Sequence, residues 1–95
     1  MPRVRDVTEP GCLVIGERRL ADGAPDRAVL SVAPVRRIVY QGAVYGTTAI
    51  QVTPSAAGQF EMRLPPGEYV VKSHSGTARI LVPDEALVRF EDILR

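Results

Sequence analysis

The sequence predicts a small all-β protein, an antiparallel β-sandwich of six or seven strands with a short C-terminal helical turn or docking tail. Two patterns predict this class: segments in which apolar and polar residues alternate, and turn residues that interrupt them at intervals of about ten positions. The length of 95 residues fits one domain. We expect residues 1–11 to form an N-terminal arm and residues 12–95 to form the sandwich, with 83–95 as its docking segment.

The first half of the chain consists of short candidate strands separated by turn residues. Residues 12–20, CLVIGERRL, predict a strand in which Gly16 marks a bulge or a close backbone approach. The turn cluster ADGAPD follows at 21–26. A second strand is then expected at 29–32, and Pro34 stops it because proline lacks the N–H that a ladder needs.

The segment 36–52, RRIVYQGAVYGTTAIQV, favours a further hairpin. Its turn falls at Gln41-Gly42, between two apolar runs. Gly46 interrupts the second arm, so the strand order over 33–52 is left open.

The segment 59–82 carries the strongest strand pattern, and we expect an antiparallel meander there. Pro65-Pro66-Gly67 predicts an exposed hairpin end, since proline cannot continue a central strand and glycine adopts the backbone angles of tight turns. A second turn is expected at His74-Ser75-Gly76. The residues expected to line one core are Phe60, Met62, Leu64, Tyr69, Val71, Ile80 and Val82.

The C-terminal segment VPDEALVRFEDILR, 82–95, allows two interpretations. Asp84 could cap a helix with Leu87, Phe90 and Leu94 on one stripe. Alternatively, residues 86–90 alternate as a last strand and only EDILR turns helical, which is the interpretation we favour.

Large apolar residues at a chain end, which is usually frayed and polar, predict docking on another surface. The candidate interface residues of this segment are Val88, Phe90, Ile93 and Leu94. They exceed what one more strand needs, so self-association is expected, and a trimer would suit a fibre or spike.

Charge and cysteine content argue against several classes of partner. The formal net charge of +1 creates no strong field for nucleic acid or an anionic membrane. No apolar run opens the sequence MPRVRDVTEPG, so we expect no signal peptide and synthesis in the cytoplasm. Cys12 is the single cysteine, so it cannot form a disulfide within the chain.

The inventory of reactive side chains does not favour an enzyme. His74 is the only histidine and falls in an expected turn, where a solvated role is the simplest interpretation. One cysteine and one histidine do not make a typical zinc site, so we expect neither a metal nor a cofactor. Tyr40 and Tyr45 are the candidate aromatic platform for a glycan or another ligand.

The stretch Gly58-x-Phe60-x-x-x-Leu64-Pro65-Pro66-Gly67-x-Tyr69-x-Val71 resembles the signature of carboxypeptidase-regulatory-like domains, which have a transthyretin-like (prealbumin-like) sandwich. Upstream, Gly16, LADGAP at 20–25 and Val29 are similar to the opening of that family. Downstream, ILVPDEALVRFEDIL at 80–94 is similar to the close of small phage structural proteins with this fold.

The resemblance implies adhesion, assembly or domain support without catalysis. We therefore expect a non-enzymatic structural protein of a tailed-phage-like particle: a head decoration, fibre-base or tail protein that contacts its own copies and other particle proteins. Two alternatives remain open. One is a freestanding ligand- or glycan-binding sandwich, which needs Tyr40 and Tyr45 exposed beside a groove. The other is an accessory subunit of a bacterial complex.

Overall fold

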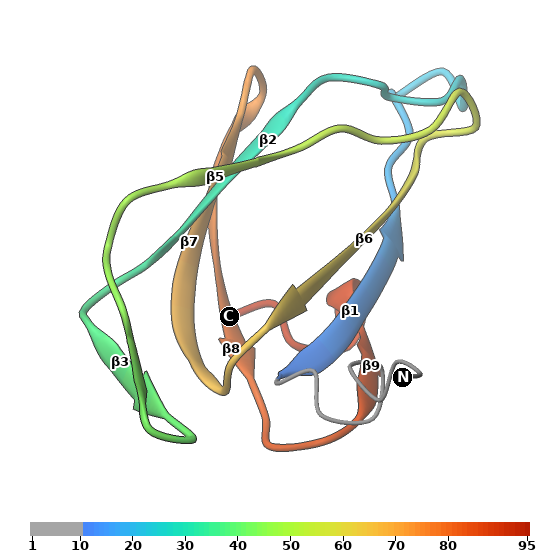
Figure 1. Ribbon diagram of the computed structural model, residues 1–95. Helices are drawn as coiled ribbons and strands as arrows, with labels where there is room; N and C mark the ends of the chain where they lie inside the picture. The colour runs from blue at the N-terminus through green and yellow to red at the C-terminus, as the bar shows by residue number, and fades with distance from the viewer. Residues whose placement is uncertain (1–10) are drawn as a thin grey trace, which may run out of the picture.

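The computed structural model describes residues 11–95, so all but Gly11 of the expected arm over 1–11 lies outside the described residues. The described chain is built of short strands and one 3-10 turn (Figure 1). In chain order these elements are β1 Cys12–Glu17, β2 Leu30–Pro34, β3 Ile38–Tyr40, β4 Ala43–Tyr45, β5 Ile50–Val52, β6 Gln59–Leu64, β7 Gly67–Ser73, β8 Gly76–Val82, β9 Leu87–Arg89 and η1 Phe90–Asp92.

Seven of these strands form the two layers of a sandwich, as the sequence predicts. One sheet has the order β6-β1-β9, in which β1 pairs antiparallel with β6 and parallel with β9. The other has the order β5-β2-β7-β8 and is antiparallel throughout. The remaining strands, β3 and β4, form a separate hairpin beside the sandwich (Figure 1).

The core lies between the two sheets and follows the alternation of the strands. In β6 the pattern is strict, with buried residues at every second position. All seven residues predicted to line the core are buried, each with at most 5% of its surface exposed. The core cluster also contains Cys12, Val14, Leu30, Val32, Val52 and Ile93.

Two expectations for the first half are confirmed. The β3–β4 hairpin turns at Gln41 and Gly42, which have φ angles of 50° and 81°. Positive φ angles at both central residues are typical of two-residue hairpin turns, because the twist of such turns matches that of the two strands. Gly16 marks no bulge, because the β1–β6 register runs without interruption, and the close approach there is that of the Phe60 and Phe90 side chains to the Gly16 backbone. A Cβ at Gly16 would lie 2.5 Å from the Phe60 ring and 2.9 Å from the Phe90 Cβ.

The expected meander over 59–82 is wrong in its first turn. β6 and β7 lie in different sheets, so Pro65-Pro66-Gly67 is a crossing between layers and no hairpin. Pro65 is buried, and its carbonyl accepts a 2.7 Å hydrogen bond from the Tyr69 hydroxyl. Alternation could not distinguish the two arrangements, because both turn the same apolar residues toward the same core. Only β7 and β8 form the expected hairpin, with its turn at residues 74–75.

The C-terminal segment follows the favoured interpretation, and the helix over 84–95 is wrong. A strand, β9, pairs with β1 and is followed at once by the 3-10 turn η1. The last residues then return to β8, where the Leu81 N–H donates to the Ile93 carbonyl (3.1 Å) and the Arg95 N–H to the Arg79 carbonyl (2.9 Å). This end of the chain therefore joins the edges of the two sheets.

Candidate functional site

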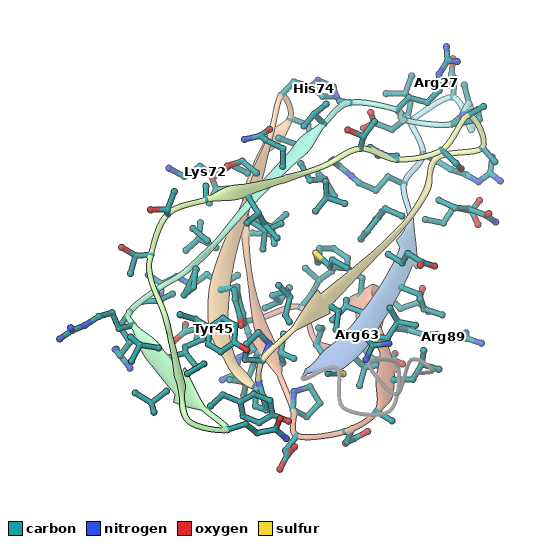
Figure 2. The ribbon with its side chains drawn as sticks, viewed as in Figure 1. Arg27, Tyr45, Arg63, Lys72, His74 and Arg89 are labelled. Atoms are coloured by element: carbon teal, nitrogen blue, oxygen red, sulfur yellow. The ribbon has the colours of Figure 1, made fainter. Side chains whose placement is uncertain are left out.

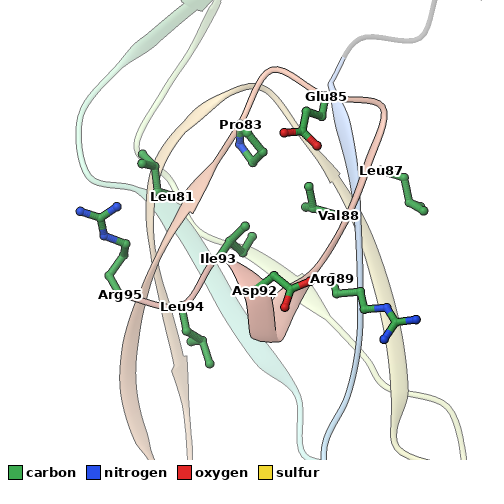
Figure 3. Close-up of a pocket in the computed structure, with 10 residues that line it drawn as sticks. All are labelled: Leu81, Pro83, Glu85, Leu87, Val88, Arg89, Asp92, Ile93, Leu94 and Arg95. Atoms are coloured by element: carbon green, nitrogen blue, oxygen red, sulfur yellow. The ribbon is translucent and has the colours of Figure 1, made fainter.

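A groove between β8 and β9, with a volume of about 560 Å³, lies at the C-terminal end of the fold (Figure 3). We call it the tail groove. Its apolar lining residues are Leu81, Pro83, Leu87, Val88, Ile93 and Leu94. Its charged residues are Glu85, Arg89, Asp92 and Arg95.

The tail groove forms because the chain leaves one sheet and joins the edge of the other. After β8, residues 83–86 cross between the layers, and the Leu13 N–H donates to the Ala86 carbonyl (2.9 Å) where β9 begins. The 3-10 turn then reverses the chain, and residues 93–95 return to β8. Both walls of the groove are therefore held by backbone hydrogen bonds, on one side between β9 and β1 and on the other between residues 93–95 and β8.

The structure separates the four candidate interface residues of the tail. Ile93 is 9% exposed and belongs to the core. Phe90 packs edge-to-face on Phe60, with ring centroids 5.3 Å apart and an angle of 79°, and Val88 is also half-buried against the core. Leu94 is the one that remains open to solvent, with 46% of its surface exposed.

Two further leucines, which we did not select from the sequence, share the tail groove with Leu94. Leu81 is 44% exposed and Leu87 is 53% exposed. Leu81 carries a signal that could have found it, since it is a large apolar residue at the outward position between buried Ile80 and Val82. Leu87 carries the same signal, since the alternation expected over 86–90 places it at an outward position beside Val88.

Tyr40 and Tyr45 lie on one face of the β3–β4 hairpin, and both are half-buried. Tyr45, labelled in Figure 2, extends from the hairpin. It lines a largely apolar hollow of about 410 Å³ together with residues of both sheets, among them Ile50, Leu64 and Tyr69. The Tyr40 hydroxyl accepts a 3.4 Å hydrogen bond from Gln41 and does not line that hollow. The two tyrosines therefore do not form one aromatic platform.

His74 lies in the expected turn and is 55% exposed, but it has a partner that the sequence did not reveal. Its Nε2 is 3.3 Å from both carboxylate oxygens of Asp26, which is 6% exposed. Arg18 lies 3.5 Å from the same carboxylate and donates a 2.9 Å hydrogen bond to Ser75. The Ala28 N–H, His74 and Arg18 lower the pKa of Asp26. This group ties the loop after β1 to the β7–β8 turn.

Cys12 is 1% exposed, and burial raises the pKa of its thiol. Over residues 11–95, no three His, Cys, Asp or Glu side chains gather as they would around a metal ion. In the same part of the chain, no helix has the length and apolar character needed to cross a membrane.

Comparison with known proteins gives no family to which the chain can be assigned. No protein-family profile matches the sequence, and no curated protein is significantly similar to it. The likeness to carboxypeptidase-regulatory-like domains therefore depends on the stretch from Gly58 to Val71 and its flanking segments alone.

Proposed function

We propose that the protein is a non-enzymatic structural protein that acts by contact with other proteins, and that the tail groove is its docking surface. The observation that carries the proposal is that three leucines, Leu81, Leu87 and Leu94, line one groove, each with 44–53% of its surface exposed. Exposed apolar residues gathered at one place on a small protein mark contact sites more often than residues scattered singly.

The chemistry of the groove defines the partner surface. Burying a whole large apolar side chain gains roughly 1.5–3 kcal/mol, so completing the burial of three half-exposed leucines gains about 2–4 kcal/mol. The groove carries two arginines, Arg89 and Arg95, and two acidic residues, Glu85 and Asp92. A partner that fits inserts apolar side chains and presents both charges around them, which is the character of a protein surface.

The particle that we propose as the setting is tailed-phage-like, with this protein as a head decoration, fibre-base or tail component made in the host cytoplasm. The support is the resemblance of residues 80–94 to the close of small phage structural proteins, the segment that also forms most of the tail groove. Quantitative mass spectrometry of particles purified from the producing cells should find the chain in fixed ratio to the major structural protein. Its absence from intact particles would contradict this setting.

Point variants test the docking surface better than a truncation. Deleting residues 86–95 would remove β9 and the core residue Ile93, so unfolding would hide any loss of docking. Leu87→Lys and Leu94→Lys change exposed positions and should keep the fold. Both should abolish co-sedimentation of purified protein with particles that lack it. Val39→Lys is the matched control, since Val39 is 74% exposed on the distant β3–β4 hairpin. Equal binding by all three variants would refute the role of the groove.

A second candidate function has one specific observation in its favour. Tyr45 lines the apolar hollow of about 410 Å³ between the sheets, a size within the range of small-molecule sites. The hollow suits a small aromatic ligand better than a glycan, because its walls are mainly apolar side chains. Titration with indole should shift the NMR signals of Tyr45 and Leu64 if this function is real. Unchanged signals at saturating indole would exclude it.

A further inference from the structure

The outer edge of β6 is open within the part of the chain that the structure describes. β6 lies at one end of the sheet order β6-β1-β9, and no strand of residues 11–95 pairs with its other side. The opposite sheet ends in the three-residue strand β5 on one side and in β8 on the other, and the edge of β8 is partly paired with residues 93–95. An open strand edge presents backbone donors and acceptors to which another strand can bond.

The register of the β1–β6 ladder shows which backbone groups point outward. Arg18 lies opposite Gly58, one step beyond the Glu17–Gln59 pair, and its N–H donates to the Gly58 carbonyl (2.9 Å). In an antiparallel ladder, bonded positions alternate, so even-numbered residues of β6 direct their backbone groups to β1. The odd-numbered residues 59, 61 and 63 direct theirs to the outer edge.

The contacts of Gln59 agree with this assignment and shorten the part of the β6 edge that is open. Its carbonyl accepts from the Ser55 N–H (2.7 Å) and its N–H donates to the Ser55 hydroxyl (3.2 Å), so the loop before β6 covers its first position. Pro65, which has no N–H, follows the strand. The part of the edge that can accept a strand is therefore short and centred on Met62.

We propose that this edge binds the same edge of a second copy of the protein. The two β6 strands run antiparallel about a two-fold axis at Met62, so that Glu61 faces Arg63 of the second copy and Arg63 faces its Glu61. Each facing pair exchanges two backbone hydrogen bonds, and the two three-stranded sheets become one six-stranded sheet. The buried face of β6 stays in its own core.

Charge complementarity selects this occupant and this register. The side chains of Glu61 and Arg63 are exposed, and opposite charges directly across an antiparallel pair stabilise it. A two-residue shift in one direction places Glu61 opposite Glu61, and a shift in the other places Arg63 opposite Arg63. Arg63 also donates to the Gly11 carbonyl (3.4 Å), and its guanidinium has five N–H groups, so it can keep present contacts while it meets a carboxylate.

The pairing is independent of the proposed docking at the tail groove, because β6 and β9 lie at opposite edges of the same sheet. A copy that binds a second copy through β6 keeps its tail groove accessible. Loss of one contact and loss of the other are therefore distinguishable in the same protein.

Amide hydrogen exchange of the full chain, followed by NMR at several protein concentrations, is the direct test. The amides of Glu61 and Arg63 should become protected as the concentration rises, whereas the even-numbered amides of β6 should be protected throughout. Protection of Glu61 and Arg63 that is independent of concentration would mean that the edge is covered within one chain. Rapid exchange at every concentration would mean that it is open. Either result overturns the proposal.

Charge exchange supplies the second test, with the dimer dissociation constant measured by sedimentation equilibrium. Glu61→Arg turns two attractive pairs into repulsive ones and should weaken the dimer about tenfold or more. Adding Arg63→Glu in the same chain should recover most of that loss, because opposite charges face each other again. Lys72→Glu, an exposed change on β7, is the control and should leave the constant unchanged. A double variant as weak as the single one would overturn the register.

Discussion

Replacing Tyr69 by phenylalanine should lower the free energy of unfolding by about 1–3 kcal/mol, because the change leaves a buried acceptor without its donor. Tyr69 is 2% exposed, and its hydroxyl donates a 2.7 Å hydrogen bond to the carbonyl of buried Pro65. Phenylalanine keeps the ring and its packing, so the loss measures the hydrogen bond that fixes the crossing between the two sheets.

Urea unfolding at neutral pH, followed by circular dichroism, provides the assay. Thermal unfolding gives a second measurement. For a domain of this size, each 1 kcal/mol of stability shifts the melting temperature by roughly 4–8 °C, so a loss of about 2 kcal/mol should lower the melting temperature by about 10 °C. Tyr40→Phe is the matched control, since its hydroxyl has only a 3.4 Å contact with Gln41 at the exposed hairpin. That variant should stay within about 0.5 kcal/mol of the wild type.

Two outcomes would refute the reasoning. If Tyr69→Phe were as stable as Tyr40→Phe, the hydroxyl of Tyr69 would not hold the crossing. If the slope of the unfolding free energy against urea concentration also became clearly smaller, the variant would have changed the compactness of the folded or the unfolded state. The lost stability would then not measure the hydrogen bond.

Four further measurements test other parts of the fold. Phe60→Ala should cost about 3–5 kcal/mol in urea unfolding, and a loss below about 1 kcal/mol would contradict its core position. Gly16→Ala should cost about 1–3 kcal/mol by the same assay, since the new Cβ would lie 2.5 Å from the Phe60 ring; a neutral result would mean that this ring moves freely. The pKa of Asp26 is lowered, so its ionised form stabilises the fold above the ordinary carboxyl pKa, and this contribution is lost as the pH falls through the lowered value. The stability gap between wild type and Asp26→Asn should therefore narrow in acid, and a constant gap would exclude the effect. Burial raises the pKa of Tyr69, so the neutral phenol stabilises the fold below the ordinary tyrosine pKa, and alkaline unfolding should begin as the pH rises above about 10. Tyr69→Phe should reduce this alkaline loss of stability, and an unchanged loss would exclude the contribution of Tyr69.

Alternation along the chain was enough to predict the part of the core that residues 60–82 contribute. Phe60, Met62 and Leu64 are buried while Glu61 and Arg63 between them are exposed, as the period of two requires. The turn at Gln41-Gly42 was predicted from its place between two apolar runs, and both residues have positive φ angles in the structure. These features depend on neighbours within a few positions, and local sequence contains that information.

Pairing between distant strands was not accessible in the same way. Pro65-Pro66-Gly67 ends a strand in either arrangement, and whether the next strand bonds to β6 or lies in the facing sheet depends on β1 and β2. The partner of His74 was hidden for a similar reason, since Asp26 is 48 positions away and belongs to a loop. The sequence shows that these residues are present, but it does not show which of them are in contact in the fold.

The candidate surfaces depend on such pairings even more strongly. Leu81, Leu87 and Leu94 are spaced six and seven positions apart. With this spacing, the three residues together cannot lie on one face of a single strand or of a single helix. They line one groove because β9 joins β1, the 3-10 turn reverses the chain and residues 93–95 return to β8. The sequence showed more large apolar residues at the C-terminus than one strand needs. In the structure some of them lie in the core, such as Ile93, and others remain exposed, such as Leu94. Ile93 completes the core of its own domain, so it is not available for the docking proposed at the tail groove. Variants at the exposed leucines can therefore test that docking without removing the core.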